Sequence, residues 1–226
     1  MSTNFYRNTL HDYRFLLNKG YPERGSIQLV GDRYRLTKIQ RNCLYRGVSS
    51  NTLAQSRAKK LVQKNAISGS ILSIDWYNVV ITIESYLKGI PVFIGDDNIV
   101  RDAAGNYGSY RQGKQTQKAR ALILETLPNL NASFVQIYLD KPVSRSGETA
   151  DTLRNKLTEM KITNSDIAVV KSADYMLKRQ EGIIATSDTA IIDSVSAVFD
   201  LSRYILEKEF NKKLPDTLEV LTRFAK

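Results

Sequence analysis

From residue 71 onward the chain alternates short apolar runs with helix-length segments, and this alternation restricts its fold more than any other feature of the sequence. Strands that alternate with helices of this length form βαβ units, in which a parallel sheet lies between two layers of helices. We therefore predict an α/β fold with a three-layer, Rossmann-like parallel sheet. The expected strands are 71–75, 91–95, 134–139, 167–170 and 183–187, and the expected helices are 79–87, 115–127, 147–160, 173–179, 188–194 and 202–210.

The first 66 residues differ from the rest of the chain in both pattern and charge. Helical spacing at 4–17, 33–47 and 51–65 predicts a small, mainly helical unit, while 26–30 fits either a short strand or a helical turn. These residues hold 13 Lys and Arg against 3 Asp and Glu, whereas residues 67–226 hold 20 of each, so the entire formal charge of +10 lies in the first segment. We predict a basic helical domain at 1–66 and an α/β domain at 67–226.

A charge distribution this one-sided indicates a surface that binds a polyanion, and basic helices bind phosphate groups without specifying sequence. Nucleic acid is therefore the expected partner. The alternative is that the basic surface packs against an acidic crevice of the second domain. The candidate phosphate-binding residues of this segment are Arg33, Arg35, Lys38, Arg41, Arg46, Lys59 and Lys60.

Two of the apolar runs end on an aspartate, Asp75 in ILSID and Asp188 in GIIATSD. Ligands of open α/β sheets bind beyond the carboxyl ends of the strands, and a carboxylate leaving a core strand is costly unless something pairs with it. If both strands are central and parallel, the two side chains face each other across one crevice. Two carboxylates at such a short distance disfavour being ionised together, and a hard divalent cation between them usually offsets this repulsion.

Further acidic residues follow the other expected strands. Asp96 and Asp97 follow 91–95, while Glu148 and Asp174 open the helices after the next two strands. Each has an alternative structural role, because aspartates cap helices and occupy turns and acidic groups complement helix dipoles. Together they predict a carboxylate site that binds Mg²⁺ or Mn²⁺, with Asp75, Asp174 and Asp188 as metal ligands and with Asp97 and Glu148 as further catalytic candidates.

The chain has too few cysteines and histidines for most other catalytic chemistries. Cys43 is the only cysteine and His11 the only histidine, so an intramolecular disulfide, a structural zinc site and a Ser–His or Cys–His nucleophile are not expected. No apolar run approaches the length of a membrane span, and the N-terminus lacks the apolar core of a signal peptide. We therefore expect a cytoplasmic protein with no membrane partner, whose chemistry depends on carboxylates.

The polar segment 98–114 is long for a loop of a compact α/β unit, which indicates a functional role. It contains Arg101, Arg111 and Lys114 beside Tyr107 and Tyr110. Arginine next to aromatic rings suits single-stranded nucleic acid, through phosphate pairing and base stacking. The alternative is a solvated loop whose tyrosines pack on the sheet.

Three short motifs resemble the PIN/NYN-like nucleases over roughly residues 70–210. They are ILSIDWYN, with Asp75 and Asn78, then the K-x-x-D at 171–174, and IIATSD ending at Asp188. The whole chain also resembles an uncharacterised prokaryotic family in which a short basic domain precedes a PIN-like domain. One position departs from the NYN pattern: Ala190 stands where a second aspartate is usual, and Asp193, one helical turn on, is a potential replacement.

The resemblance implies metal-dependent cleavage of phosphodiesters, with RNA favoured over DNA, and hence an endoribonuclease that uses Mg²⁺ or Mn²⁺. Asn78 would orient the site or bond a ligand water. Because of Ala190, the number of metal ions stays open. Two other functions also stay open: an inactive nucleic-acid-binding protein, and a metal-dependent phosphohydrolase acting on a small phosphate ester. A homo-oligomer is equally compatible with the sequence.

Overall fold

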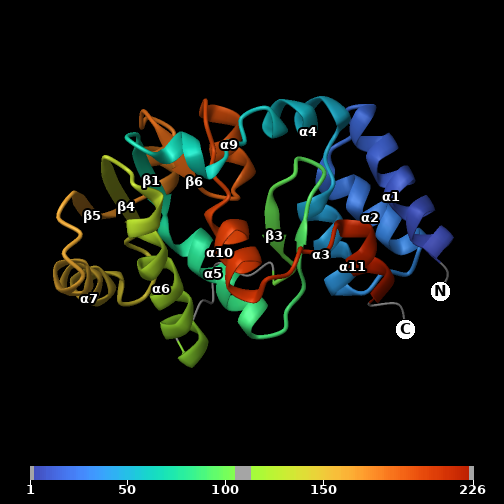
Figure 1. The fold of residues 1–226 in the computed structure, drawn as a ribbon. Helices are drawn as coiled ribbons and strands as arrows, with labels where there is room; N and C mark the ends of the chain where they lie inside the picture. The colour runs from blue at the N-terminus through green and yellow to red at the C-terminus, as the bar shows by residue number, and fades with distance from the viewer. Residues whose placement is uncertain (1–2, 105–112, 224–226) are drawn as a thin grey trace.

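The computed structural model describes residues 3–104 and 113–223 of the chain (Figure 1). Four helices come first, and the α/β part follows them. The helices are α1 (Thr3–Asn18), α2 (Glu23–Arg33), α3 (Lys38–Gly47) and α4 (Asn51–Ala58). The segment 26–30, which the sequence left open, is therefore helical, and the helix expected at 51–65 ends at Ala58, followed by a 3₁₀ turn at Lys64–Ile67.

The main sheet contains four parallel strands in the order β5-β4-β1-β6. These are β1 (Ile71–Asp75), β4 (Phe134–Asp140), β5 (Ser165–Val170) and β6 (Ile183–Ala185). The prediction of an α/β fold with a parallel sheet is confirmed. The chain moves from β1 through β4 to β5 and then crosses to the other side of β1 for β6. The strand order thus reverses between β1 and β6, and such switch points are where α/β sheets bind ligands.

Helices cover both faces of this sheet, as the alternation along its strands requires. Ile183 packs with the helices of one face, α5 (Trp76–Leu87), α6 (Lys114–Thr126), α7 (Ser146–Glu159) and α10 (Leu201–Phe210). Ile184, the next residue, packs on the opposite face with α8 (Ala173–Leu177) and α9 (Thr189–Ser194). Short strands with apolar residues on both faces are buried between two helical layers, which agrees with the continuous apolar runs of the sequence.

The expected strand at 91–95 does not belong to the parallel sheet. Its residues form β2 (Val92–Ile94), which pairs antiparallel with β3 (Val100–Asp102) in a separate two-stranded sheet. Asn98 adopts a left-handed conformation, with φ of 62°, in the turn between them. A short apolar run has the same pattern in a parallel strand as in a buried hairpin strand, so the pattern alone did not distinguish the two.

The N-terminal helices share their hydrophobic core with segments from distant parts of the sequence. Tyr6, Tyr13 and Leu44 of α1 and α3 pack with Phe93 of β2 and with Leu221 of α11 (Thr217–Arg223). Figure 1 shows α11 beside the N-terminal helices, and both ends of the chain lie on that side. Residues beyond the expected boundary at 66, in β2 and α11, thus complete the core of the N-terminal helices.

Candidate active site

A cavity of about 310 Å³ opens at the carboxyl edge of the parallel sheet, beside the switch point between β1 and β6. Four carboxyl groups from four different segments line it, and three of them are the aspartates that the sequence predicted to lie together, Asp75, Asp174 and Asp188. The lining residues are Asp75, Tyr77, Asn78, Asp140, Lys171, Ser172, Asp174 and Asp188. We call this space the acidic cavity.

Asp75 is the last residue of β1, and the chain turns from it directly into α5. Its side chain is buried, and its Oδ2 accepts a hydrogen bond of 2.8 Å from the Thr186 hydroxyl. Burial raises the pKa of Asp75 to about 8; the Thr186 hydrogen bond opposes that rise, and the charges of the other three cavity aspartates add to it. Asp75 is therefore a carboxyl group that the folded chain alone keeps protonated near neutral pH.

Backbone hydrogen bonds hold Asp188 and Asp140, and one of them also positions the helix that carries Asp174. Asp188 Oδ1 accepts from the N–H groups of Ala190 and Ile191 at 2.8 and 3.1 Å, so its alternative role as the cap of α9 is confirmed while it also lines the cavity. Asp140 Oδ1 accepts from the Ala173 N–H at 2.7 Å and thereby fixes the start of α8, the helix that carries Asp174. The fold therefore presents all three carboxylates to one space.

Mutual repulsion among these carboxylates is visible in the pKa of Asp174. Partial burial raises this pKa first, and the negative charges of Asp188 and Asp140 raise it further. The same neighbours act on Asp75. Asp140 and Asp188 thus lie close enough to Asp75 and Asp174 to disfavour the ionised forms of those two groups.

Asp140 was missing from the sequence prediction, although the signal for it was present. It ends the apolar run FVQIYLD in the same way that Asp75 ends ILSID, and β4 is the strand next to β1. The predicted strand ends one residue earlier, at 139, and so leaves out this aspartate. The rule that identified the first two aspartates would have identified this one.

Asn78 lies one turn into α5 and is buried. Its Oδ1 accepts from both the backbone N–H and the hydroxyl of Ser187, at 2.8 and 2.9 Å. This pair of contacts holds the segment that follows β6 against the helix that follows β1. Asn78 therefore fixes the position of Asp188 relative to Asp75.

The structure does not bring Asp97 or Glu148 to the acidic cavity. Both oxygens of Asp97 accept from the Arg101 guanidinium at 2.6 Å in the buried hairpin turn of β2 and β3. The Glu148 side chain is 74% exposed and lies 4.0 Å from Arg145. Asp97 lies outside the acidic cavity because the strand before it belongs to the hairpin. Glu148 lies outside it because α7 begins farther along the sheet edge and directs this side chain to solvent.

Asp193 does not replace the carboxylate that Ala190 lacks. Its two oxygens accept from the Arg57 guanidinium at 2.7 and 2.8 Å, and this hydrogen-bonded pairing lowers the pKa of Asp193. Arg57 belongs to α4 of the N-terminal helices. Asp193 therefore joins these helices to α9, and it is absent from the residues that line the acidic cavity.

Several basic residues of the N-terminal segment contact the rest of the protein instead of solvent. Arg14 pairs with Asp96 at 2.8 Å, Arg46 pairs with Asp102 at 3.2 Å, and Lys60 donates to the backbone oxygens of Ile192 and Asp193. Arg41 pairs within the segment, with Asp32. Arg14, Arg46 and Lys60 thus contact groups of the later part of the chain, but none of those groups lines the acidic cavity, the crevice that the alternative prediction named.

The remaining basic candidates fall into three groups. Arg33, Arg35, Lys38 and Lys59 are exposed on the N-terminal helices, and Lys114 is exposed at the start of α6. Arg101 lies in β3 and is buried against Asp97, so it is not exposed for phosphate binding as the loop prediction expected. Arg111, with Tyr107 and Tyr110, lies outside the described residues.

The acidic cavity contains donors that suit a divalent cation. Within residues 3–104 and 113–223, no three His, Cys, Asp or Glu side chains form a ready-made metal site. The donor chemistry nevertheless fits, because carboxylate oxygens are the hard ligands that Mg²⁺ and Mn²⁺ prefer, and an ion would offset the repulsion that raises the pKa values of Asp75 and Asp174. Asp75, Asp140, Asp174 and Asp188 are the residues that could hold it.

Fold and site together define an α/β protein with a carboxylate cavity at the switch point of a parallel sheet. Residues 64–204 match the family model described as "Domain of unknown function (DUF5616)", and residues 7–60 match "Protein of unknown function (DUF434)". The chain belongs to the DUF5616 family. It is 36% identical over 198 residues to "Uncharacterized protein MJ0935" of Methanocaldococcus jannaschii, an alignment that spans 87% of this chain and 94% of the relative.

No solved structure matches the chain. Among the described residues, none of the helices combines the length and the apolar character needed to cross a membrane.

Proposed function

We propose that this chain is a divalent-metal-dependent nuclease with a PIN-like domain, and that it hydrolyses phosphodiester bonds inside RNA strands. The observation that carries the proposal is the convergence of Asp75, Asp140, Asp174 and Asp188 on one cavity at the switch point of the sheet. Asp140 and Asp188 also hold the starts of α8 and α9, but those hydrogen bonds do not account for four carboxyl groups around one cavity, whereas a bound cation would.

A bound Mg²⁺ or Mn²⁺ would supply a metal-activated water and would stabilise negative charge on the phosphate oxygens. The four aspartates would hold the ion, and Asn78 would fix the position of Asp188 relative to Asp75 through its contacts with Ser187. Lys171 is exposed at the rim, where its ammonium group can meet a substrate phosphate. No histidine is required, which suits a chain whose single histidine lies in α1.

A surface beside the cavity favours a nucleic-acid strand over a small phosphate ester. Tyr175, next to Asp174, is 56% exposed, and the Arg179 guanidinium lies 3.6 Å from the centre of its ring. Stacked aromatic and guanidinium planes bind unpaired bases of RNA. The exposed basic side chains on the N-terminal helices add sequence-independent attraction for phosphates.

The fourth carboxylate also bears on whether the site is active. The departure at Ala190 suggested an inactive binding protein, since one ligand of the NYN pattern is missing there. Asp140 lines the same cavity and provides a carboxylate from a different strand. A site with four carboxylates retains the charge needed to hold a divalent cation, so we favour an active nuclease.

Cleavage of end-labelled single-stranded and structured RNA in Mg²⁺ and in Mn²⁺ tests the proposal. Asp75→Asn, Asp140→Asn and Asp188→Asn should each lower the cleavage rate by about 10²-fold or more, because each removes a charged ligand worth several kcal/mol to the transition state. Two matched controls should cleave like the wild type: Asp166→Asn, at the start of β5, and Glu148→Gln, outside the cavity. EDTA should abolish cleavage.

Three results would contradict the proposal in different ways. Cleavage that persists in Asp75→Asn and Asp188→Asn would place the active site elsewhere. RNA binding without cleavage in either metal would identify a binding protein. Metal-dependent hydrolysis of a phosphate monoester, unaffected by substitution of the exposed basic residues and without RNA cleavage, would identify a phosphohydrolase.

A further inference from the structure

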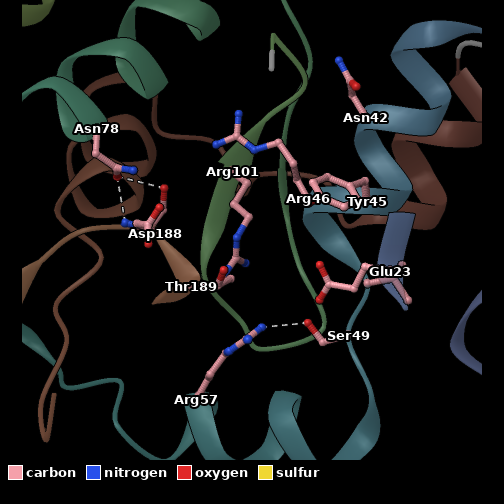
Figure 2. A pocket seen from close by; sticks show the side chains of 12 residues that line it. Glu23, Asn42, Tyr45, Arg46, Ser49, Arg57, Asn78, Arg101, Asp188 and Thr189 are labelled. Atoms are coloured by element: carbon pink, nitrogen blue, oxygen red, sulfur yellow. Dashed lines mark hydrogen bonds between the residues drawn. The ribbon is translucent and has the colours of Figure 1, made fainter. Parts of the chain in front are cut away.

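A second cavity, of about 370 Å³, lies between the N-terminal helices and the parallel sheet. Its walls come from α2, α3 and α4 on one side and from α5, β3 and the segment after β6 on the other. Figure 2 shows Tyr45, Arg46 and Glu23 facing Asn78 and Asp188 across this space, with Arg101 between them. We call it the seam pocket.

The seam pocket adjoins the acidic cavity. Asn78 and Asp188 line both spaces, so a ligand in the seam pocket lies within a side chain's width of the proposed metal ligands. The two spaces differ in charge, because four aspartates and one lysine line the acidic cavity, whereas three arginines and two acidic residues line the seam pocket. The contact between them suggests that one substrate occupies both.

The charges of the seam pocket argue against a free phosphate as its ligand. Each of its arginines is already paired with a carboxylate, in the pairs Arg46–Asp102, Arg57–Asp193 and Arg101–Asp97. Glu23 and Asp188 add two acidic groups to the lining. The pocket therefore has no excess of positive charge, and it suits a polar ligand without a net charge of its own.

The pocket nevertheless offers fixed hydrogen-bond donors. The Arg57 and Arg101 side chains are 5% and 3% exposed, and ion pairing holds both in place. In the described part of the chain each uses three of its five N–H groups for these carboxylates and for Ser49 Oγ or Ile99 O, which leaves donors for a ligand. Glu23 and Asp188 supply acceptors at the same walls.

Tyr45 supplies a planar apolar surface. Its side chain is 41% exposed while it lines the pocket, so the ring is available for contact. Rigid donors and acceptors around an aromatic ring are the combination by which proteins bind an unstacked nucleobase, through its edge and its face. A pocket of this volume is also within the range that encloses a small organic ligand.

We propose that the seam pocket binds the base and ribose of one unpaired nucleotide, next to the phosphodiester that occupies the acidic cavity. This inference rests on the proposed nuclease function and assigns the substrate class as single-stranded RNA. A base inside a duplex has its edge paired and its face stacked, so it cannot enter the pocket without breaking the helix. The N-terminal helices thereby help to select the substrate, since Tyr45 and Glu23 belong to them.

Fluorescence anisotropy with a labelled RNA oligonucleotide in EDTA measures binding without cleavage. The single strand should bind at least about 10-fold more tightly than its duplex. Tyr45→Ala should weaken binding of the single strand by about 5- to 150-fold, the range found when a stacking ring is removed. Tyr45→Phe should bind like the wild type, because it keeps the ring. Tyr21→Ala should also bind like the wild type, since Tyr21 is an even more exposed tyrosine of the N-terminal segment that lies outside the pocket.

Equal affinity for single strand and duplex, or wild-type affinity of Tyr45→Ala, would overturn the inference. So would a requirement for a terminal phosphate, tested by comparing 5′-phosphorylated with 5′-hydroxyl RNA, since the pocket would then be an anion site. The proposed function fails separately: tight single-strand binding that depends on Tyr45, without metal-dependent cleavage, would keep the pocket and reject the nuclease. Metal-dependent cleavage that is insensitive to Tyr45→Ala would keep the nuclease and reject the pocket as its nucleotide site.

Discussion

The acidic cavity and the seam pocket contain the same kind of residue in opposite electrostatic states. In the acidic cavity, Asp75 is buried among other carboxylates and its pKa is raised to about 8. Beside the seam pocket, Asp193 accepts two hydrogen bonds from Arg57 and its pKa is lowered. The two regions share Asp188 and Asn78, so the difference arises over a short distance. An aspartate paired with an arginine thus has a structural role here, whereas aspartates that share a cavity without a partner cation form the candidate site.

The arginines that pair with carboxylates around the seam pocket come largely from the N-terminal helices. Arg14, Arg46 and Arg57 each contact a carboxylate of the later part of the chain. Much of the one-sided charge of the sequence thus serves to attach these helices to the α/β part. Only the exposed remainder is available to attract phosphate groups.

Breaking one pair on the seam side should produce the largest change in stability. Arg101→Ala leaves the Asp97 carboxylate buried without a cation, and Asp97 and Arg101 are both almost fully buried. Loss of one partner of a buried pair costs about 3–5 kcal/mol, which corresponds to a fall in melting temperature of about 6–20 °C for a chain of this size. Thermal unfolding followed by circular dichroism measures it.

Two variants sharpen this expectation. The double variant Arg101→Ala with Asp97→Ala should recover part of the lost stability, because no unpaired charge remains. Arg33→Ala removes an exposed arginine and should change stability by less than about 0.5 kcal/mol. A melting temperature of Arg101→Ala within a degree of the wild type would show that the pairing on the seam side does not stabilise the fold.

The second expected effect is a dependence of stability on pH that has opposite signs in the two regions. Asp75 binds its proton more tightly in the folded than in the unfolded state, so its contribution is fully present below about pH 4 and is lost as the pH rises through about 8. In metal-free buffer Asp75→Asn should remove this loss and be more stable than the wild type at pH 8, by about 2–4 kcal/mol. Chemical denaturation across this pH range measures the difference.

Two other aspartates give this measurement its internal controls. The pKa of Asp200 is also raised, to about 6, mainly by burial, so a loss of stability between about pH 4 and 6 should persist in Asp75→Asn. Asp193 has a lowered pKa, and its contribution is present above its ordinary pKa and lost as the pH falls. Asp193→Asn should therefore lose stability at neutral pH; a gain there would contradict the contrast between the two regions.

The sequence predicted the parts of this molecule that depend on local pattern. The strands of the parallel sheet, their helices and the aspartates at 75 and 188 follow from apolar runs with polar ends, and Asp140 follows from the same rule although it was not considered. The arginine partners of the aspartates cannot be predicted from local pattern. Asp97 pairs with Arg101 only because the chain forms a hairpin there, and Asp193 pairs with Arg57 across 136 residues of chain. The contribution of α11 to the N-terminal core is equally non-local.

The smallest expected effect is the response of the two regions to metal. If the acidic cavity holds Mn²⁺, the ion at ten times its dissociation constant should stabilise the wild type by about 1.4 kcal/mol, or about 3–6 °C in melting temperature at pH 8. Asp174→Asn and Asp75→Asn should lose this shift, because each removes a proposed ligand. Asp193→Asn should keep it, since Asp193 pairs with Arg57 and does not line the cavity. A shift that survives in Asp174→Asn and disappears in Asp193→Asn would place the metal on the seam side, and the distinction between paired and unpaired aspartates would no longer identify the site.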